Sequence, residues 1–466
     1  MLERLFKLGE FGTNPRTEII AGITTFVTMA YILFLNPAIL KGTGMSEGAV
    51  FFATAVGAGI VTLMMGLFVN FPVGLAPGMG LNAYFAVVAA ANGGVMTWQV
   101  ALGAVFVAGL IFILLTVTGF RQLLVKALPD SLKYAITVGI GLFITLIGLK
   151  LGQVTTVTFV GGPSAEAIKA GAPVVNLLFF EWNIGLTDFI ANKVAALTLI
   201  GLLIAGILTT LRVRGALLIG IILTTLIGIP LGVTNTSSLS NPTFLPNFGE
   251  LALFKLDFSM LSSGIFWEVV IIFVFVTLFD SFGTLVGTAN RAGLLNRPDG
   301  EKRLGRAMFV DGSGVSIGAL LGVTPMTAYV ESAAGIESGG RTGLTAVTTG
   351  ILFLLSVVLL APFVQVIPDA ATAPALIVVG VLMMSSVRHI KWDDFGIAMP
   401  AFLTIALMPF TYSIANGISI GIIFYVVLNV VRNLFTKDAD QKVSIHWLMW
   451  VIALLALARY ILLAGE

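Results

Sequence analysis

Long apolar runs of helical length recur along almost the whole chain, separated by short polar connections. These runs do not alternate polar and apolar residues with a period of two, so the pattern predicts membrane-spanning helices rather than the strands of an outer-membrane barrel. A bilayer core about 30 Å thick needs roughly 20 helical residues. On this basis the runs predict fourteen spans, at 18–40, 49–70, 74–91, 98–118, 130–150, 190–211, 215–233, 264–289, 304–322, 324–339, 342–362, 370–387, 395–411 and 413–432.

Composition agrees with this pattern. Hydrophobic residues make up 58% of the chain and charged residues 10%, and no polar segment is long enough to form a separate soluble domain. We therefore expect an all-α polytopic membrane protein of the plasma or inner membrane. The N-terminal stretch MLERLFKLGEFGTNPRTE lacks a signal-peptide pattern, so the first helix is expected to be a retained span.

Charge and cysteine content narrow the classes of function. The net charge of +2 gives no indication of a nucleic-acid partner, and a chain without cysteine has no disulfide framework and no thiol metal site. The sequence offers no catalytic motif. We expect a protein that is not an enzyme and that uses no cofactor and no metal site.

Basic residues in the connections predict the orientation of the chain. With a cytoplasmic N-terminus, nineteen of the 25 Lys and Arg residues lie on the cytoplasmic side. The external ones are Lys41, Lys150, Lys169, Lys193 and Lys255. Arg459 falls in an extra apolar segment within 443–466, and the side of this segment stays open.

The two halves of the chain resemble each other. FVTMAYILFL (26–35) matches FVTLFDSFGT (275–284), LPDSLKYAITVGIGL (128–142) matches IPDAATAPALIVVGVL (367–382), and RGALLIGII (214–222) matches NGISIGII (416–423), in the same order. Because each half holds seven predicted spans, the second copy must be inverted relative to the first. Such 7+7 inverted repeats are typical of secondary transporters, whose binding sites lie near the midplane where the repeats meet.

Two interrupted segments occupy corresponding positions in the halves. PVGLAPGMGLNAYF (72–85) and TPMTAYVESAAG (324–335) contain too much proline and glycine for continuous helices. We expect each to be a short extended piece that leads into a half-helix starting near the membrane centre. The two helix N-termini would then offer free N–H groups to a shared cavity, since non-helical backbone at this depth needs protein or water around it.

Three polar residues are predicted to lie at this cavity. Glu331 and Asn82 fall in the first turns of the two half-helices, and Asp280 lies near the middle of the eighth span. A carboxylate at that depth costs at least about 2.5 kcal/mol, which favours a function. The alternatives are that Glu331 caps its own helix, that Asp280 is a structural acceptor, and that Asn82 is an ordinary N-cap.

Three further charged residues in or near the predicted spans have interpretations other than a direct place at the cavity. Asp311, in the ninth span, is either structural or functional. Glu337 and Arg341 are spaced as an ordinary i,i+4 ion pair near the cytoplasmic end.

The motifs DSFGTLVGTAN (280–290), TAYVESAAG (327–335) and GLAPGMGLNAYF (74–85) together resemble the nucleobase-ascorbate transporter family, in its adenine/guanine/hypoxanthine permease branch. The resemblance covers nearly all of 15–433. It implies a core domain (15–120 and 260–365), a gate domain (121–235 and 366–434) that also forms a homodimer, and an elevator-like movement of the core domain. It also implies that Asp280 and Glu331 hold the base, with Gly80 and Asn82 on the third-span side and Ala328 at the same cavity. Thr284 replaces a histidine found in the uracil permeases of the family, which argues against pyrimidine specificity.

The expected function is therefore import of a purine base by symport with a proton or sodium ion. The N–H groups of a purine can donate hydrogen bonds to carboxylates. The acceptors of a purine ring can accept hydrogen bonds from backbone N–H groups and from the Asn82 amide. Burial favours the neutral form of a carboxylic acid, which makes Asp280 and Glu331 candidate proton sites. We expect Glu331 to accept from the base and Asp280 to carry the proton. An anion exchanger of the same fold and a channel are the alternatives; the acids argue against the first and the inverted repeat against the second.

Overall fold

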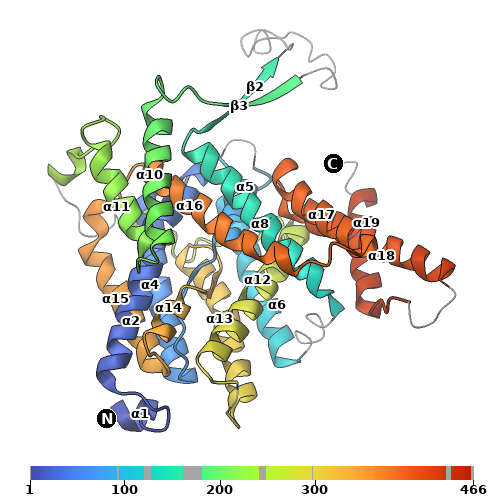
Figure 1. The fold of residues 1–466 in the computed structure, drawn as a ribbon, viewed down its shortest axis with the longest axis horizontal. Helices are drawn as coiled ribbons and strands as arrows, with labels where there is room; N and C mark the ends of the chain where they lie inside the picture. Colours follow the sequence, from blue (N-terminus) through green and yellow to red (C-terminus); the bar gives the residue numbers. More distant parts are fainter. Residues whose placement is uncertain are drawn as a thin grey trace.

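The computed structural model describes residues 2–91, 94–119, 127–160, 181–240, 248–295, 297–436 and 442–462. Its helices are α1 (Leu2–Phe6), α2 (Pro15–Met29), α3 (Ile32–Leu40), α4 (Glu47–Met64), α5 (Met79–Val88), α6 (Trp98–Val117), α8 (Asp130–Leu151), α10 (Lys193–Thr210), α11 (Ala216–Gly228), α12 (Gly264–Arg291), α13 (Gly300–Leu321), α14 (Ser332–Glu337), α15 (Gly343–Leu359), α16 (Asp369–Met384), α17 (Phe395–Phe410), α18 (Ile414–Phe435) and α19 (Trp447–Leu462). The strands are β1 (Leu75–Pro77), β2 (Thr155–Val160), β3 (Glu181–Leu186) and β4 (Met326–Ala328) (Figure 1).

The helices confirm a multi-pass membrane protein. Within the described part of the chain, eight helical stretches are long and apolar enough to cross a bilayer. Shorter apolar helices accompany them, at Met79–Val88, Ala216–Gly228, Gly343–Leu359, Phe395–Phe410 and Trp447–Leu457. The predicted extra segment is thus helical, and α19 packs beside α18.

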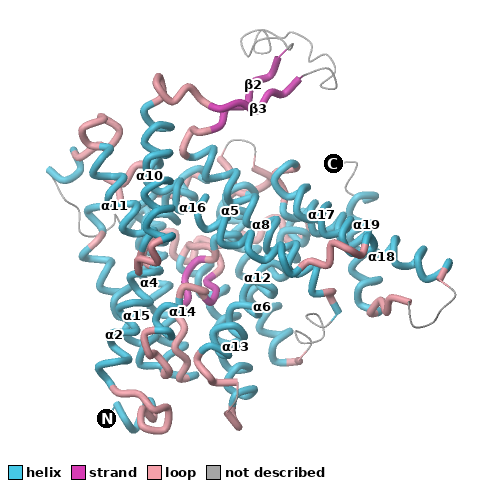
Figure 2. Tube along the Cα trace, in the orientation of Figure 1, coloured by secondary structure: helices cyan, strands magenta, loops and turns pink. Residues whose placement is uncertain are grey.

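The helices pack in two groups. In the first, α15 lies against both α2 and α4, and α6 lies against α12 and α13. In the second, α8 lies against α16 and α17, α17 lies against α18, and α10 lies against α11 and α16. The strands β1 and β4 lie at the centre of the molecule, whereas β2 and β3 extend away from the helices, as the magenta segments of Figure 2 show.

The first span is interrupted, although its hydropathy predicts one helix over 18–40. Helix α2 ends at Met29 and α3 begins at Ile32. Between them the Leu33 amide donates to the Ala30 carbonyl at 3.1 Å and the Phe34 amide to the Tyr31 carbonyl at 3.2 Å. These bonds reach back three residues rather than four, so the helix tightens here into one 3₁₀ turn. The Leu35 amide then resumes the α-helical pattern with a bond to the Tyr31 carbonyl at 3.0 Å.

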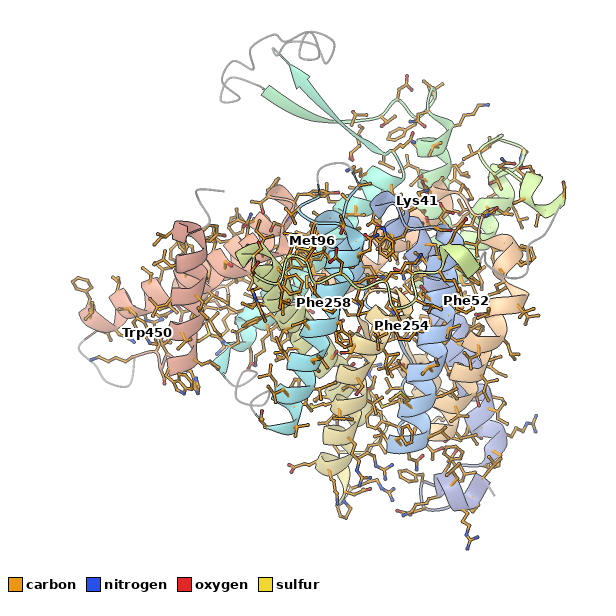
Figure 3. All side chains as sticks on the ribbon, turned by 180° about the vertical axis from the view of Figure 1, so that it is seen from behind. Lys41, Phe52, Met96, Phe254, Phe258 and Trp450 are labelled. Atoms are coloured by element: carbon orange, nitrogen blue, oxygen red, sulfur yellow. The ribbon has the colours of Figure 1, made fainter. Side chains whose placement is uncertain are left out.

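The connection before α12 lies across the ends of α6 and α13. The Asp257 amide donates to the Gln99 carbonyl at 3.1 Å, and the Phe254 amide to the Leu320 carbonyl at 2.8 Å. The ring of Phe258 lies 6.4 Å from that of Phe106. Figure 3 shows Phe254 and Phe258 on this connection, which therefore fixes the start of α12 relative to its neighbours.

Helices α2 and α15 are joined by a buried carboxylate. The Glu18 side chain accepts from the Arg341 amide at 2.8 Å, just before α15, and from the Thr345 amide at 3.2 Å, in the first turn of α15, and so satisfies part of the N-terminus of this helix. The expected pair between Glu337 and Arg341 is wrong. Glu337 instead binds Arg291 at 2.9 Å, because the Arg341 guanidinium donates to backbone carbonyls.

Candidate functional site

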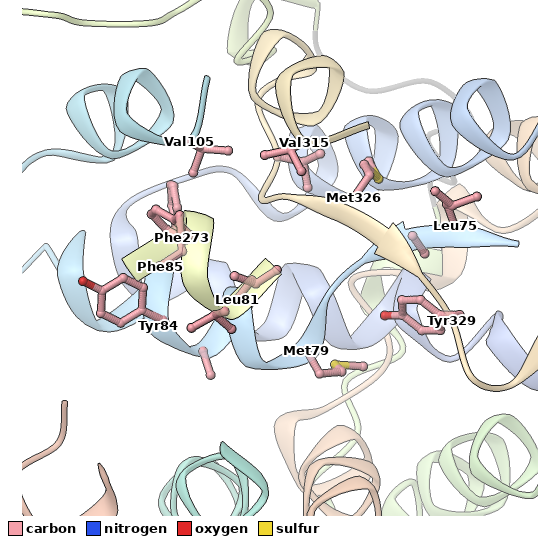
Figure 4. Packing of buried hydrophobic residues seen from close by; sticks show 14 of the residues in the cluster. Leu75, Met79, Leu81, Tyr84, Phe85, Val105, Phe273, Val315, Met326 and Tyr329 are labelled. Carbon is pink, nitrogen blue, oxygen red and sulfur yellow. The ribbon is translucent and has the colours of Figure 1, made fainter. Parts of the chain in front are cut away.

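Two short strands from opposite halves of the chain pair at the molecular centre. Strands β1 and β4 are antiparallel, with Leu75 opposite Ala328 and Pro77 opposite Met326. The pairing continues beyond the strands, because the Gly78 amide donates to Pro325 and the Tyr329 amide to Gly74, both at 3.0 Å. Each interrupted segment thus satisfies the buried backbone of the other, as apolar surroundings require. Figure 4 shows Leu75, Met326 and Tyr329 packed around the pair.

Side chains from neighbouring helices form hydrogen bonds with the backbones of the two strands. On β1, the Thr62 hydroxyl donates to the Leu75 carbonyl at 3.0 Å and accepts from its amide at 2.9 Å. On β4, Asp311 of α13 accepts from the Ala328 amide at 3.0 Å through Oδ1. Of the two readings of Asp311, the structure favours the structural one, because this carboxylate holds the backbone of β4.

The two candidate acids lie at β4 and just after it. Asp280, on α12, accepts from the Thr327 hydroxyl of β4 at 3.4 Å. Glu331, three residues beyond β4, accepts from the Tyr31 hydroxyl at 2.6 Å through Oε1. Both carboxylates are partly buried. With Asp311, which also contacts β4, they form a group of acids that attracts N–H donors or protons and repels anions.

The helix that follows β4 differs from the expected half-helix. Helix α14 has six residues, and Glu331 lies just before it without capping it. The Ser332, Ala333 and Ala334 amides donate to the carbonyls of residues 329, 330 and 331, at 3.2, 2.9 and 3.0 Å. The expectation that this N-terminus offers free N–H groups is therefore wrong, because a tight first turn already satisfies them.

Asn82 lies on the other half-helix, α5, with its side chain fully buried. The N-cap of α5 is Gly78, so the reading of Asn82 as an ordinary N-cap is wrong. Its Oδ1 accepts from the Thr324 hydroxyl. Within the described residues its Nδ2 has no hydrogen-bond partner, which leaves a buried donor available to a bound molecule.

The glycines of the third span have different surroundings. A side chain at Gly80 would meet Ile140 of α8 at 2.5 Å, so Gly80 lies against that helix. A side chain at Gly78 would lie 2.8 Å from the Thr327 hydroxyl and 3.6 Å from Asp280 Oδ2. Gly78, rather than Gly80, is thus the glycine beside the acid, and Ala328 is buried in β4.

Sequence reasoning missed the polar groups that support the acids. Tyr31 and Thr327 donate to Glu331 and Asp280, and the Tyr329 hydroxyl donates to the Pro77 carbonyl. The hydroxyl of a tyrosine within the apolar run FVTMAYILFL is the sequence feature that could have indicated a role for Tyr31. In the part of the chain that the structure describes, no group of His, Cys, Asp or Glu could hold a metal ion.

Comparison with known proteins gives a consistent result. The sequence model described as "Permease family", of xanthine/uracil permeases, matches residues 16–420. The adenine permease AdeP of Escherichia coli is 41% identical over 432 residues, covering 92% of this chain and 91% of AdeP. The guanine/hypoxanthine permease PbuG of Bacillus subtilis is 40% identical over 443 residues, covering 92% of this chain and 94% of PbuG.

Solved structures show the same fold at low sequence identity. The transmembrane domain of a cyanobacterial bicarbonate transporter, BicA, matches with a TM-score of 0.57 and 17% identity, covering 89% of this chain and 96% of that domain. The murine Solute Carrier 26 family member A9 anion transporter matches with a TM-score of 0.59 and 11% identity, covering 90% of this chain and 68% of that protein. At such low sequence identity, these matches show similarity of fold alone.

Proposed function

The chain belongs to the xanthine/uracil permease family, also called the nucleobase-ascorbate transporter family, and on that premise we propose that it imports purine nucleobases by secondary active transport. Members of this family are permeases rather than enzymes. The relatives at about 40% identity are described as carriers of adenine or of guanine and hypoxanthine. The matches to these relatives extend over nearly the full chain, which supports a purine base as the substrate of this protein too.

The observation that carries this proposal is the pair of carboxylates around β4. Asp280, on α12, accepts from Thr327 of β4, and Glu331, three residues after β4, accepts from Tyr31 of the first span. A purine base offers N–H donors to such acids, and the Asn82 amide nitrogen can donate to a ring nitrogen or carbonyl of the base. Asp280, Glu331 and Asn82 are thus the proposed substrate-binding residues, with Ala328 in the adjoining strand. Gly80 was predicted at this site, but its contact with Ile140 leads us to propose an indirect role at the boundary with α8.

The alternative, an anion exchanger, is supported by the shared fold alone. The bicarbonate and anion transporters share 17% and 11% of the aligned residues, whereas the purine permeases share about 40%. The acids around residues 327–331 disfavour a bound anion. A channel is disfavoured by the repeat of two interrupted segments in the two halves, which is typical of secondary transporters.

We propose that the coupling ion is a proton held by Asp280 or Glu331. Glu331 is the proposed acceptor for a purine N–H, because the Tyr31 hydroxyl orients it. Asp280, on a continuous helix, is the proposed proton carrier. Sodium coupling is the alternative, and a dependence of accumulation on external sodium would reveal it.

At larger scale, we propose fourteen spans in a 7+7 inverted repeat with a cytoplasmic N-terminus. The two packing groups support a core domain of 15–120 and 260–365 and a gate domain of 121–235 and 366–434. The proposed transport step is an elevator-like movement of the core against the gate, and the gate forms a homodimer. Segment 443–466 is an addition to this plan.

Uptake of a radiolabelled panel tests the proposed function. Cells that lack their own purine permeases, expressing this protein, should take up at least one of adenine, guanine, hypoxanthine and xanthine, and the unlabelled bases should compete. Cells with the empty vector are the control. Uptake of bicarbonate or sulfate without any purine would contradict the proposal and favour the anion exchanger.

A further inference from the structure

We propose that Tyr31 is a positioning residue for the substrate site, because its hydroxyl fixes one oxygen of the Glu331 carboxylate and leaves the other to accept from the base. This inference rests on the proposed function, and it adds to the site a residue from the first span.

The contact between the two residues is short and buried. Tyr31 is 0% exposed, and its hydroxyl lies 2.6 Å from Glu331 Oε1. Nearby, the Thr28 hydroxyl lies 3.4 Å from the Glu331 backbone carbonyl. The first span therefore holds both the side chain and the main chain of Glu331.

Tyr31 lies in the short turn between α2 and α3. Its backbone stays in the right-handed helical region, with φ −57° and ψ −26°. Its carbonyl accepts from the Phe34 amide at 3.2 Å and from the Leu35 amide at 3.0 Å. A backbone held in this way gives the Tyr31 hydroxyl a defined place beside Glu331.

Close packing keeps Tyr31 and Glu331 in register. A side chain at Gly335 of α14 would meet the Thr25 hydroxyl at 2.0 Å and the Ala21 carbonyl at 2.7 Å. The backbone of α14 therefore lies directly against α2, with no room for an intervening side chain. The segment that carries Glu331 is therefore packed against α2, the helix that precedes Tyr31.

The chemistry requires such support. A carboxylate has two oxygens that accept hydrogen bonds, and an unsupported glutamate samples several rotamers. A hydroxyl bound to one oxygen orients the group and so reduces the conformational entropy lost when the base binds. Hydrogen bonds to a charged group are stronger than those between neutral groups, so the loss of this bond should be measurable in affinity.

The test removes the hydroxyl and keeps the ring. In Tyr31→Phe, the KM for the best-transported purine should rise about tenfold, while Vmax per transporter in the membrane changes by less than about twofold. Tyr425→Phe is the matched control, since Tyr425 is a buried tyrosine of α18 outside the proposed site; it should leave KM unchanged. Surface expression and thermal unfolding of each variant are measured alongside.

A double-mutant cycle on the thermal unfolding of the purified protein tests whether Tyr31 acts through Glu331. The losses from Tyr31→Phe and Glu331→Gln should be less than additive. If Tyr31→Phe is not recovered from the membrane, Tyr31→Leu, whose side chain also lacks a donor, is measured instead and should also show a raised KM. An unchanged KM, or additive losses, would overturn the inference while purine uptake by the unsubstituted protein continued. Absence of purine uptake by that protein would instead contradict the proposed function.

Discussion

At the residue scale, Asp311 shows how a buried acid can be structural. Its Oδ1 accepts the Ala328 amide at 3.0 Å, and both residues are buried. A buried amide that loses its partner costs about 1–3 kcal/mol. The integrity of β4, and with it the approach of Asp280 to Thr327, therefore depends on Asp311.

Substitution of Asp311 should separate this role from substrate binding. Asp311→Asn keeps an acceptor oxygen and should fold and transport, whereas Asp311→Ala should lose about 1–3 kcal/mol of stability. Thermal unfolding in detergent gives the comparison. If Asp311→Ala unfolded like the unsubstituted protein while Asp311→Asn lost all purine binding, Asp311 would be a ligand of the base instead.

The two acids around β4 should have different roles. Glu331→Gln replaces an acceptor with a group that also donates, so it should chiefly weaken purine binding, by about tenfold or more. Asp280→Asn mimics a permanently protonated acid and should retain binding and exchange but lose accumulation against a gradient. Equilibrium binding and pH-driven uptake of both variants measure this. Accumulation by Asp280→Asn under a pH gradient would place the proton elsewhere.

Residue type alone identified the acids but not their partners. Asp280 and Glu331 stand out because carboxylates are costly in apolar spans. Tyr31 is 300 positions from Glu331, and no local pattern encodes such a contact. The prediction for Glu337 failed for a related reason: helical spacing indicated Arg341, but α14 ends at Glu337, and Arg291 of α12 is within reach instead.

At the scale of elements, proline and glycine predicted the two extended segments correctly. What they did not encode is the pairing of β1 with β4 and its register, since these depend on contacts about 250 residues apart. Hydropathy likewise could not detect the break between α2 and α3, because one tyrosine among apolar residues leaves the mean hydropathy of the run high. The sequence also suggested a longer helix after β4 than the six residues of α14.

The boundary between β1 and α5 should be sensitive to one methyl group. In Gly78→Ala, the added methyl would lie 2.8 Å from the Thr327 hydroxyl, so it should displace Thr327 from Asp280 and raise KM several-fold. Gly206→Ala is the control, because a side chain there meets no atom within 4 Å. The uptake KM of both variants is compared; equal values would remove Gly78 from the site.

At the scale of the whole molecule, an ion pair connects the two packing groups. Lys41, after α3, binds Asp369 at the start of α16 at 2.5 Å. Lys41 belongs to the proposed core domain and Asp369 to the proposed gate. An elevator-like movement would have to break this pair, since it carries one partner past the other.

Crosslinking this pair should therefore stop transport. The chain has no native cysteine, so Lys41→Cys with Asp369→Cys can be joined specifically by a short bifunctional maleimide. Uptake should fall to background after crosslinking, and each single cysteine should remain active. A second crosslinked pair, Arg291→Cys with Glu337→Cys, replaces an ion pair within the proposed core and should transport. Continued uptake by the crosslinked 41–369 pair would contradict movement between these domains.

Some features of the whole molecule could be predicted from the sequence, and others could not. Long apolar runs were sufficient for a multi-pass helical protein, because the bilayer fixes the length of a span. The motifs at 74–85, 280–290 and 327–335 together indicated the family, which the match over residues 16–420 confirms. The packing of α8 against α16 and of α2 against α15 depends on side-chain shape along whole helices, which composition does not encode.

The most direct test of the central claim is purine accumulation by the purified protein in liposomes. With an inward proton gradient, the unsubstituted protein should concentrate a radiolabelled purine above its external level, and a proton ionophore should abolish the accumulation. Empty liposomes and the Asp280→Asn variant are the controls. Accumulation by the unsubstituted protein alone is the predicted result. No entry of any purine, with bicarbonate entering instead, would contradict the assignment of this protein as a purine transporter.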